Sequence, residues 1–176
     1  MKNIFLVLLV SFSVSSFAQS IDQSNSKVEF KIGSIMWAKV KGEISNMKGT
    51  VKFNEAKPTQ AFFDVSINVN TINTDNEKRD THLKTEDFFD VNKYPQISYK
   101  SSSVTTTENG YLSKGKLTIK DITKEVSIPF ILIKDGGKES LVGEFEIERL
   151  DYNVGVDQST MLVDKKVKLT ITCTLK

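Results

Sequence analysis

Apolar and polar residues alternate along most of the chain. Val28, Phe30 and Ile32 are separated by charged residues. A period of two puts successive side chains on opposite faces of a strand, so one face is apolar and the other polar. The pattern returns at Val51 and Phe53; at Phe63, Val65, Ile67 and Val69; at Leu117 and Ile119; at Phe145 and Ile147; and at Val167, Leu169, Ile171, Cys173 and Leu175. Each segment predicts a strand with one buried face.

Two turn sequences lie between predicted strands. Asn109-Gly110 and Asp135-Gly136-Gly137 are both typical of tight hairpin turns, so we expect antiparallel pairing on either side of each. About eight or nine strands emerge, and no segment with a helical period is long enough to cover a sheet. The pattern therefore predicts an all-β fold, either an antiparallel barrel or a sandwich.

The segment NTDNEKRDTHLKTEDFFD, residues 73–90, interrupts the alternation. Thr74 and Glu77 have the spacing of a capping box, in which the threonine hydroxyl accepts a hydrogen bond from the amide three residues on. We therefore expect a short helical segment near 75–90, beginning near Asp75 and running towards Phe89. It would close one end of the strands.

The first 18 residues resemble a secretory signal. Lys2 precedes an apolar run at 4–10, and the small residues Ser16 and Ala18 are placed as a cleavage site requires. The run is too short to span a bilayer comfortably. We expect cleavage after Ala18, which leaves 19–176 as a single domain in the periplasm or outside the cell.

Charge and cysteine content exclude several classes of function. The formal net charge of the 176 residues is +2, and basic and acidic residues are interspersed. This balance gives no electrostatic case for nucleic acid or for a membrane surface. Cys173 is the single cysteine, so an intramolecular disulfide is impossible. It lies on the apolar face of its predicted strand, which favours a small buried side chain over a reactive thiol.

The candidate chemistry lies in the interrupting segment. Arg79, Asp80 and His82 could form an acid–base cluster, because a carboxylate can orient an imidazole while a guanidinium holds an anion. However, no nucleophile motif and no second histidine accompany them, so the sequence favours neither catalysis nor a zinc site. The alternative, which we favour, is structural: Arg79 and Asp80 pair, and His82 bonds to backbone where the helix meets the strands.

The phenylalanines of the predicted strands allow two interpretations. Phe30, Phe53, Phe63, Phe130 and Phe145 could fill a solid core. They could equally line a lumen, because a barrel of about eight strands can be filled by side chains or can hold one small ligand. The pattern alone does not separate these alternatives.

Four segments of the chain resemble the YceI-like family of polyisoprenoid-binding, lipocalin-like proteins, which is named for a bacterial periplasmic protein. They are SKVEFKI at 26–32, INVNTINTDNEKRDTHLKTEDFFDVNKYPQISY at 67–99, GKLTIKDITKEVSIPF at 115–130, and ERLDYNVGV at 148–156. The second segment is long and specific. The resemblance extends over nearly the whole chain after the signal.

The resemblance implies an extended antiparallel barrel of about eight strands whose lumen encloses the tail of a long isoprenoid lipid, such as a quinone or a polyprenyl lipid. It favours the lumen over the solid core, and makes Arg79, Asp80 and His82 a polar clasp at the helical closure. The lumen-lining residues would be those on the buried face of their strands: Phe30, Ile32, Phe53, Val65, Ile67, Leu117, Ile119, Phe145, Ile147, Leu169 and Ile171. Beyond this lipid, no cofactor, metal, nucleic acid or stable membrane insertion is expected. The sequence leaves open whether the protein forms a homodimer.

Three classes of function follow from these alternatives. The first is a lipid-binding carrier or reservoir, which we favour over the other two. The second is an enzyme that acts on an isoprenoid head group through Arg79, Asp80 and His82. The third is a secreted stress or interaction module with a solid core.

Overall fold

The computed structural model describes residues 18–34, 38–157 and 163–176. Within these residues the chain forms nine strands and one α-helix, together with short 3-10 turns. The strands are β1 (Lys27–Ser34), β2 (Ala38–Ile44), β3 (Lys48–Lys52), β4 (Phe62–Asn68), β5 (Gln96–Thr107), β6 (Gly110–Ile119), β7 (Ile122–Asp135), β8 (Lys138–Glu148) and β9 (Val163–Leu175). Almost all of the expected signal lies outside the described residues, so it stays a prediction.

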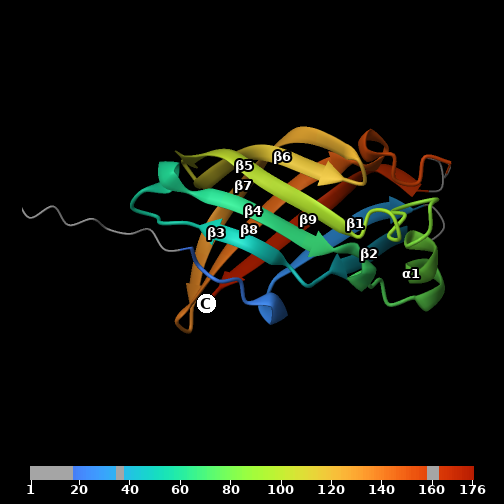
Figure 1. The fold of residues 1–176 in the computed structure, drawn as a ribbon, viewed down its shortest axis with the longest axis horizontal. Helices are drawn as coiled ribbons and strands as arrows, with labels where there is room; N and C mark the ends of the chain where they lie inside the picture. The colour runs from blue at the N-terminus through green and yellow to red at the C-terminus, as the bar shows by residue number, and fades with distance from the viewer. Residues whose placement is uncertain (1–17, 35–37, 158–162) are drawn as a thin grey trace, which may run out of the picture.

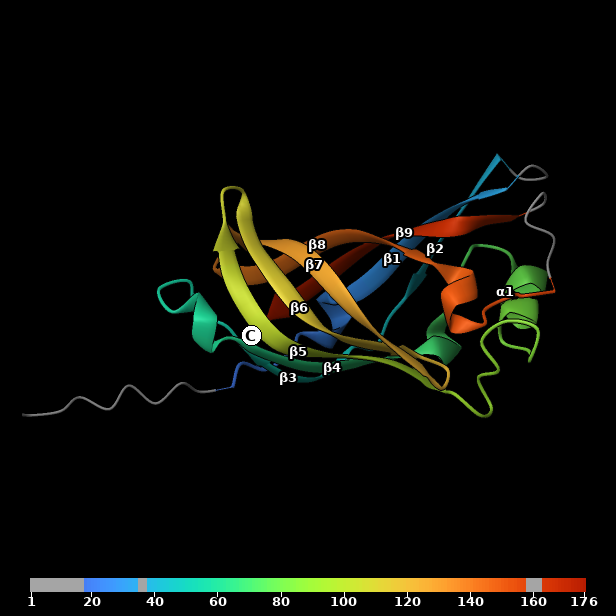
Figure 2. The ribbon, with the colours of Figure 1, turned by 90° about the horizontal axis from the view of Figure 1, so that it is seen from above.

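All nine strands belong to one antiparallel sheet in the order β2-β1-β9-β8-β7-β6-β5-β4-β3. The sheet curls into a half-barrel (Figures 1 and 2). The prediction of an all-β antiparallel barrel is confirmed, with nine strands in place of about eight. The helix α1 (Glu77–Leu83) lies at one end of the half-barrel, and the C-terminal end of β9 lies at the other (Figure 2).

The two edge strands, β2 and β3, do not pair with each other. Short segments cover part of each edge. The backbone of Glu43 in β2 exchanges two hydrogen bonds with Asn73, at 2.8 and 2.9 Å, and the amide of Gln19 donates to the carbonyl of Val51 in β3 at 2.8 Å. These bridges satisfy backbone groups that an open edge would leave for another chain to pair with.

Both expected hairpins are present. Glu108 and Asn109 connect β5 to β6, and Gly136 and Gly137 connect β7 to β8. Gly136 and Gly137 have φ angles of 54° and 80°. Positive φ at both central residues is the mark of a type I′ turn, whose twist matches that of the flanking strands.

The helical segment is present, but its start differs from the expectation. Asn76 is the N-cap, and its side-chain oxygen accepts from the amide of Arg79 at 3.0 Å. Asp75 has a φ of 58°, a left-handed conformation that a right-handed helix cannot contain. The prediction of a capping box at Thr74 is therefore wrong. The helix also ends earlier, at Leu83, where the amide and hydroxyl of Thr85 both donate to the carbonyl of His82.

Most of the buried apolar side chains lie on the inner face of the sheet. Cys173 is one of them, with 6% of its surface exposed, which confirms the prediction that it is a small buried side chain. Burial raises the pKa of its thiol to about 12. At neutral pH the thiol is therefore protonated and contributes as an apolar group.

The type I′ turn between β7 and β8 can be tested at Gly136. No atom lies within 4 Å of a Cβ added there, so the backbone conformation alone decides the cost of a substitution. Gly136→Val should lower the free energy of unfolding by about 1–2 kcal/mol, because a left-handed conformation is strained for a branched residue. Gly136→Asn should be neutral or raise it by up to about 1 kcal/mol, because asparagine tolerates this conformation and restricts the unfolded chain. Urea unfolding of both variants measures the difference, and equal values would contradict the turn assignment.

Candidate ligand-binding cavity

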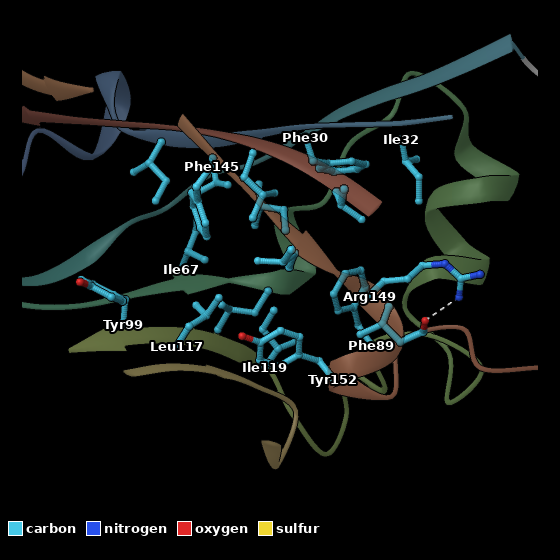
Figure 3. Close-up of a pocket in the computed structure, with 18 of the residues that line it drawn as sticks. Phe30, Ile32, Ile67, Phe89, Tyr99, Leu117, Ile119, Phe145, Arg149 and Tyr152 are labelled. Carbon is cyan, nitrogen blue, oxygen red and sulfur yellow. Dashed lines mark hydrogen bonds between the residues drawn. The ribbon is translucent and has the colours of Figure 1, made fainter. Parts of the chain in front are cut away.

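The inner face of the half-barrel surrounds a cavity of about 630 Å³. Pockets that hold small molecules in proteins have volumes of about 300–1,000 Å³ and are mostly apolar. Aliphatic and aromatic side chains, to which all nine strands contribute, form most of its wall, and Figure 3 shows part of it. The interior is therefore not a solid core.

Ten of the eleven residues expected in the lumen line this cavity. They are Phe30, Ile32, Val65, Ile67, Leu117, Ile119, Phe145, Ile147, Leu169 and Ile171. Their role in holding a ligand stays a prediction. Phe53 is the exception, because it does not line the cavity.

Phe53 belongs to a cluster of aromatic rings at the end of the cavity remote from α1. Its ring lies edge-on to Tyr111 and Phe130, with centroid distances of 4.9 and 5.5 Å, and Phe63 lies 5.6 Å from Phe130. Phe63 and Phe130 also line the cavity. They form its floor and Phe53 packs behind them, so this aromatic cluster closes one end.

A polar pair lies in the wall near the aromatic cluster. The hydroxyl groups of Tyr99 and Ser113 are 2.6 Å apart, and both residues are buried. Burial raises the pKa of Tyr99, so its hydroxyl is neutral at physiological pH. One hydroxyl donates to the other, and the O–H group of the accepting residue remains able to donate.

The opposite end is bordered by α1, where the expected polar clasp is arranged differently. The Nε of Arg79 donates to Thr74 Oγ1 at 2.8 Å, and its Nη2 donates to the Thr74 carbonyl at 2.7 Å. Asp80 accepts from the amide and the hydroxyl of the same threonine. The prediction that Arg79 and Asp80 pair with each other is wrong, because both side chains bind Thr74. The chain reverses at Asp75, which has a positive φ, and this brings Thr74 against the helix.

His82 is also placed differently from the expectation. Its Nε2 lies 2.9 Å from Asp87 Oδ2, and its ring packs edge-on against Phe88 at 5.1 Å. The expected bond to backbone is therefore wrong. About half of the imidazole is exposed to solvent, yet His82 and Lys78 both line the cavity. The cavity therefore reaches the surface beside α1.

Arg149 was not singled out from the sequence, although it lies in the ERLDYNVGV segment. Only 4% of its surface is exposed, and it lines the cavity. Its guanidinium donates to four backbone carbonyls: those of Val154 at 2.8 Å, Asp164 at 2.9 Å, Val163 at 3.2 Å, and Gly155. Figure 3 shows the side chain of Arg149. Burial lowers the pKa of Arg149, but a guanidinium stays charged at neutral pH.

The three polar residues Arg79, Asp80 and His82 are not arranged as a catalytic unit. His82 pairs with Asp87, and Arg79 and Asp80 are both bound to Thr74, so the three do not form one acid–base unit. Among the described residues, no group of three or more histidine, cysteine, aspartate or glutamate side chains is placed to hold a metal ion. No helix in that part of the chain is long and apolar enough to cross a membrane.

A curled antiparallel sheet around an apolar cavity, open beside one helix, defines a lipocalin-like class of protein. The chain belongs to the YceI-like domain family, whose model matches residues 19–175. This confirms the resemblance seen in the sequence.

Relatives and solved structures agree with this assignment. Protein YceI of Shigella flexneri is 31% identical over 136 residues, which are 74% of this chain and 71% of the relative. The crystal structure of BcnA from Burkholderia cenocepacia superposes with a TM-score of 0.83 at 26% identity, covering 89% of this chain and 99% of BcnA. A polyisoprenoid binding domain from Saccharophagus degradans superposes with a TM-score of 0.69 over 90% of this chain and 98% of that domain. At 11% identity, this last likeness shows the fold alone.

Cys173 lines the cavity and can report on it. With a pKa of about 12 in place of 9.0, its thiolate fraction at pH 8 should be roughly a thousandfold smaller than that of an exposed thiol. We expect an aromatic disulfide reagent to react far more slowly with the folded protein than with the urea-unfolded protein, because the thiolate is the nucleophile. The Cys173→Ala variant supplies the blank. Equal rates in the two states would contradict the buried placement.

Proposed function

We propose that this protein is a carrier or reservoir that encloses the apolar tail of a long isoprenoid lipid in its cavity. The observation that carries this proposal is the apolar cavity of about 630 Å³. Each methylene group removed from water contributes about 0.8 kcal/mol. A lipid tail of several isoprene units would therefore be held firmly by such a wall, and would otherwise partition into a membrane.

Membership of the YceI-like family supports the proposal, as does the fold shared with a polyisoprenoid binding domain. The cavity argues against a stress or interaction module with a solid core. The separate engagement of Arg79 and His82 argues for a binding protein over an enzyme that acts on the head group. The resemblance of the first 18 residues to a secretory signal supports a place in the periplasm, where a lipid in transit between membranes needs a protein sheath.

Lipid extraction tests the proposal directly. The chain should be expressed in a bacterium with its own leader, purified without detergent, denatured, and extracted with organic solvent. We expect mass spectrometry to detect an isoprenoid lipid at close to one molecule per protein, because transfer of the tail to water is strongly unfavourable. An extract without stoichiometric isoprenoid, followed by failure of the delipidated protein to take up added isoprenoid, would overturn the proposal.

A matched pair of substitutions separates a lipid-filled cavity from ordinary packing. Val65 lines the cavity, whereas Val104 is 2% exposed within the packed core. In a packed site, Val→Phe should lower the free energy of unfolding by about 1–3 kcal/mol. We therefore expect Val104→Phe to destabilise the delipidated protein by that amount, and Val65→Phe to cost it less.

The two variants should also differ in lipid content, and here Val65→Phe should show the larger effect. Val65→Phe should retain less co-purified lipid than wild type, because its ring occupies volume that the tail would fill. Val104→Phe, when folded, should retain the wild-type amount. Thermal unfolding of delipidated protein and quantification of extracted lipid measure the two effects. A Val65→Phe variant that keeps its lipid and loses stability would show that this position is packed core.

A further inference from the structure

The segment 76–89, which contains α1, lies between two residues in a left-handed conformation. Asp75 has a φ of 58° and Asp90 a φ of 48°. A positive φ is uncommon outside glycine and occurs where the chain changes direction sharply. The chain therefore turns on entering the segment and again on leaving it. The segment lies at the end of the half-barrel where the cavity reaches the surface (Figure 2).

The chain on either side of this segment is fixed to the body of the protein. Asn73 exchanges two backbone hydrogen bonds with Glu43 of β2, and Thr74 is buried. Gly42 permits this close approach, because a Cβ added there would lie 2.7 Å from Thr74 Cγ2 and 2.8 Å from the carbonyl oxygen of Asn73. Beyond the segment, Val91 is buried again.

The segment itself is attached to the sheet mainly by apolar contacts. Among the described residues, no hydrogen bond or ion pair joins 76–89 to a strand. The ion pair between His82 and Asp87 lies wholly within the segment. Leu83, Phe88 and Phe89 are half-buried and pack against the core.

The side-chain hydrogen bonds that leave the segment all reach one residue, Thr74. Arg79 donates from Nε to the threonine Oγ1 at 2.8 Å and from Nη2 to its carbonyl oxygen at 2.7 Å. Asp80 accepts from the amide of Thr74 at 3.0 Å and from its hydroxyl. Thr74 is anchored to β2 through Asn73, so these bonds join the segment to the sheet at a single point.

This point of attachment lies outside the cavity, whereas the segment forms part of its wall. Leu83, Phe88 and Phe89 line the cavity. Thr74 and Asp80 do not. A displacement of the segment would therefore open the wall, and a change at Thr74 would leave the wall itself unaltered.

We propose that residues 76–89 form a lid on the cavity, with Asp75 and Asp90 as its hinges and Thr74 as its latch. The proposal rests on the proposed function and concerns how the lipid enters and leaves. Hinges are commonly a few residues at the ends of elements that absorb a change in φ and ψ. When the latch is released, the lid swings on these residues and a lipid tail passes into the cavity beside Leu83, Phe88 and Phe89.

A latch that binds the lid and does not touch the ligand has a kinetic signature. Weakening it raises the population of the open lid, and the ligand both enters and leaves through the open state. Association and dissociation should therefore accelerate by the same factor, while Kd stays unchanged. A residue that contributes to binding would change Kd instead, mostly through the dissociation rate.

Thr74→Val tests the latch, because it keeps the shape of the side chain and removes the hydroxyl that binds Arg79 and Asp80. Delipidated protein should be mixed in a stopped-flow instrument with a farnesol analogue that carries a fluorescent nitrobenzoxadiazole group. Dissociation is then followed after addition of excess unlabelled farnesol. We expect both rates to rise roughly tenfold, because hydrogen bonds to charged groups are lost. Asp80→Ala should act in the same direction.

Thr118→Val is the matched control. It removes a hydroxyl that lies 2.8 Å from that of Thr123, and neither residue lines the cavity. Both rates should remain those of wild type. Amide hydrogen exchange locates the effect, because a freer lid exposes its own backbone bonds. Thr74→Val should speed exchange in 76–89 and leave exchange in β6 and β8 unchanged.

The outcomes distinguish the lid from the proposed function. If wild type binds the probe and neither Thr74→Val nor Asp80→Ala changes its rates, the lid is overturned and the lipid carrier stands. A change confined to dissociation, or an equal acceleration by Thr118→Val, also overturns the lid. If neither the probe nor unlabelled farnesol binds wild type, the proposed function fails, and the lid fails with it.

Discussion

One continuous antiparallel ladder, from β2 through β9 to β3, holds every wall of the cavity. Side chains on a strand alternate with a period of two, so a slip of one residue in any strand would turn its apolar set towards solvent. The inner face is apolar only because all eight strand pairings keep matching registers. Backbone hydrogen bonds between neighbouring strands fix the curvature of the sheet, and the apolar side chains of its inner face form the cavity wall.

The two ends of the half-barrel differ in chemistry, and this difference makes the cavity directional. At one end Phe53, Phe63, Tyr111 and Phe130 pack ring against ring. At the other end, where the cavity reaches the surface, lies a two-turn helix that polar contacts tie to Thr74. A ligand with an apolar tail and a polar head matches such a gradient in one orientation only.

Alternation predicted most of the strands and ten of the eleven cavity positions, because it reports which face of a strand is buried, and the turn residues predicted both hairpins. The strand β2 was not predicted. Alternation does not report how far along the barrel a residue lies, and so Phe53 was assigned to the cavity when it belongs to the aromatic closure. The helix start was missed because Asp75 adopts a positive φ, which overrides the capping pattern at Thr74. Arg149 was missed because its partners are backbone carbonyls, and backbone partners leave no mark in the pattern of side chains.

A cavity of this size carries a cost, because the side chains of its wall make fewer dispersion contacts with other protein groups than those of a packed core. The fold offsets this at its two ends, through the aromatic cluster and through Arg149, whose guanidinium joins the turn after β8 to the start of β9. A ligand that occupies the cavity would restore the missing contacts. Because it would bind only the folded state, it would also raise the free energy of unfolding by mass action. In the proposed carrier, stability and function would therefore be linked, because the same cavity wall would contribute to both.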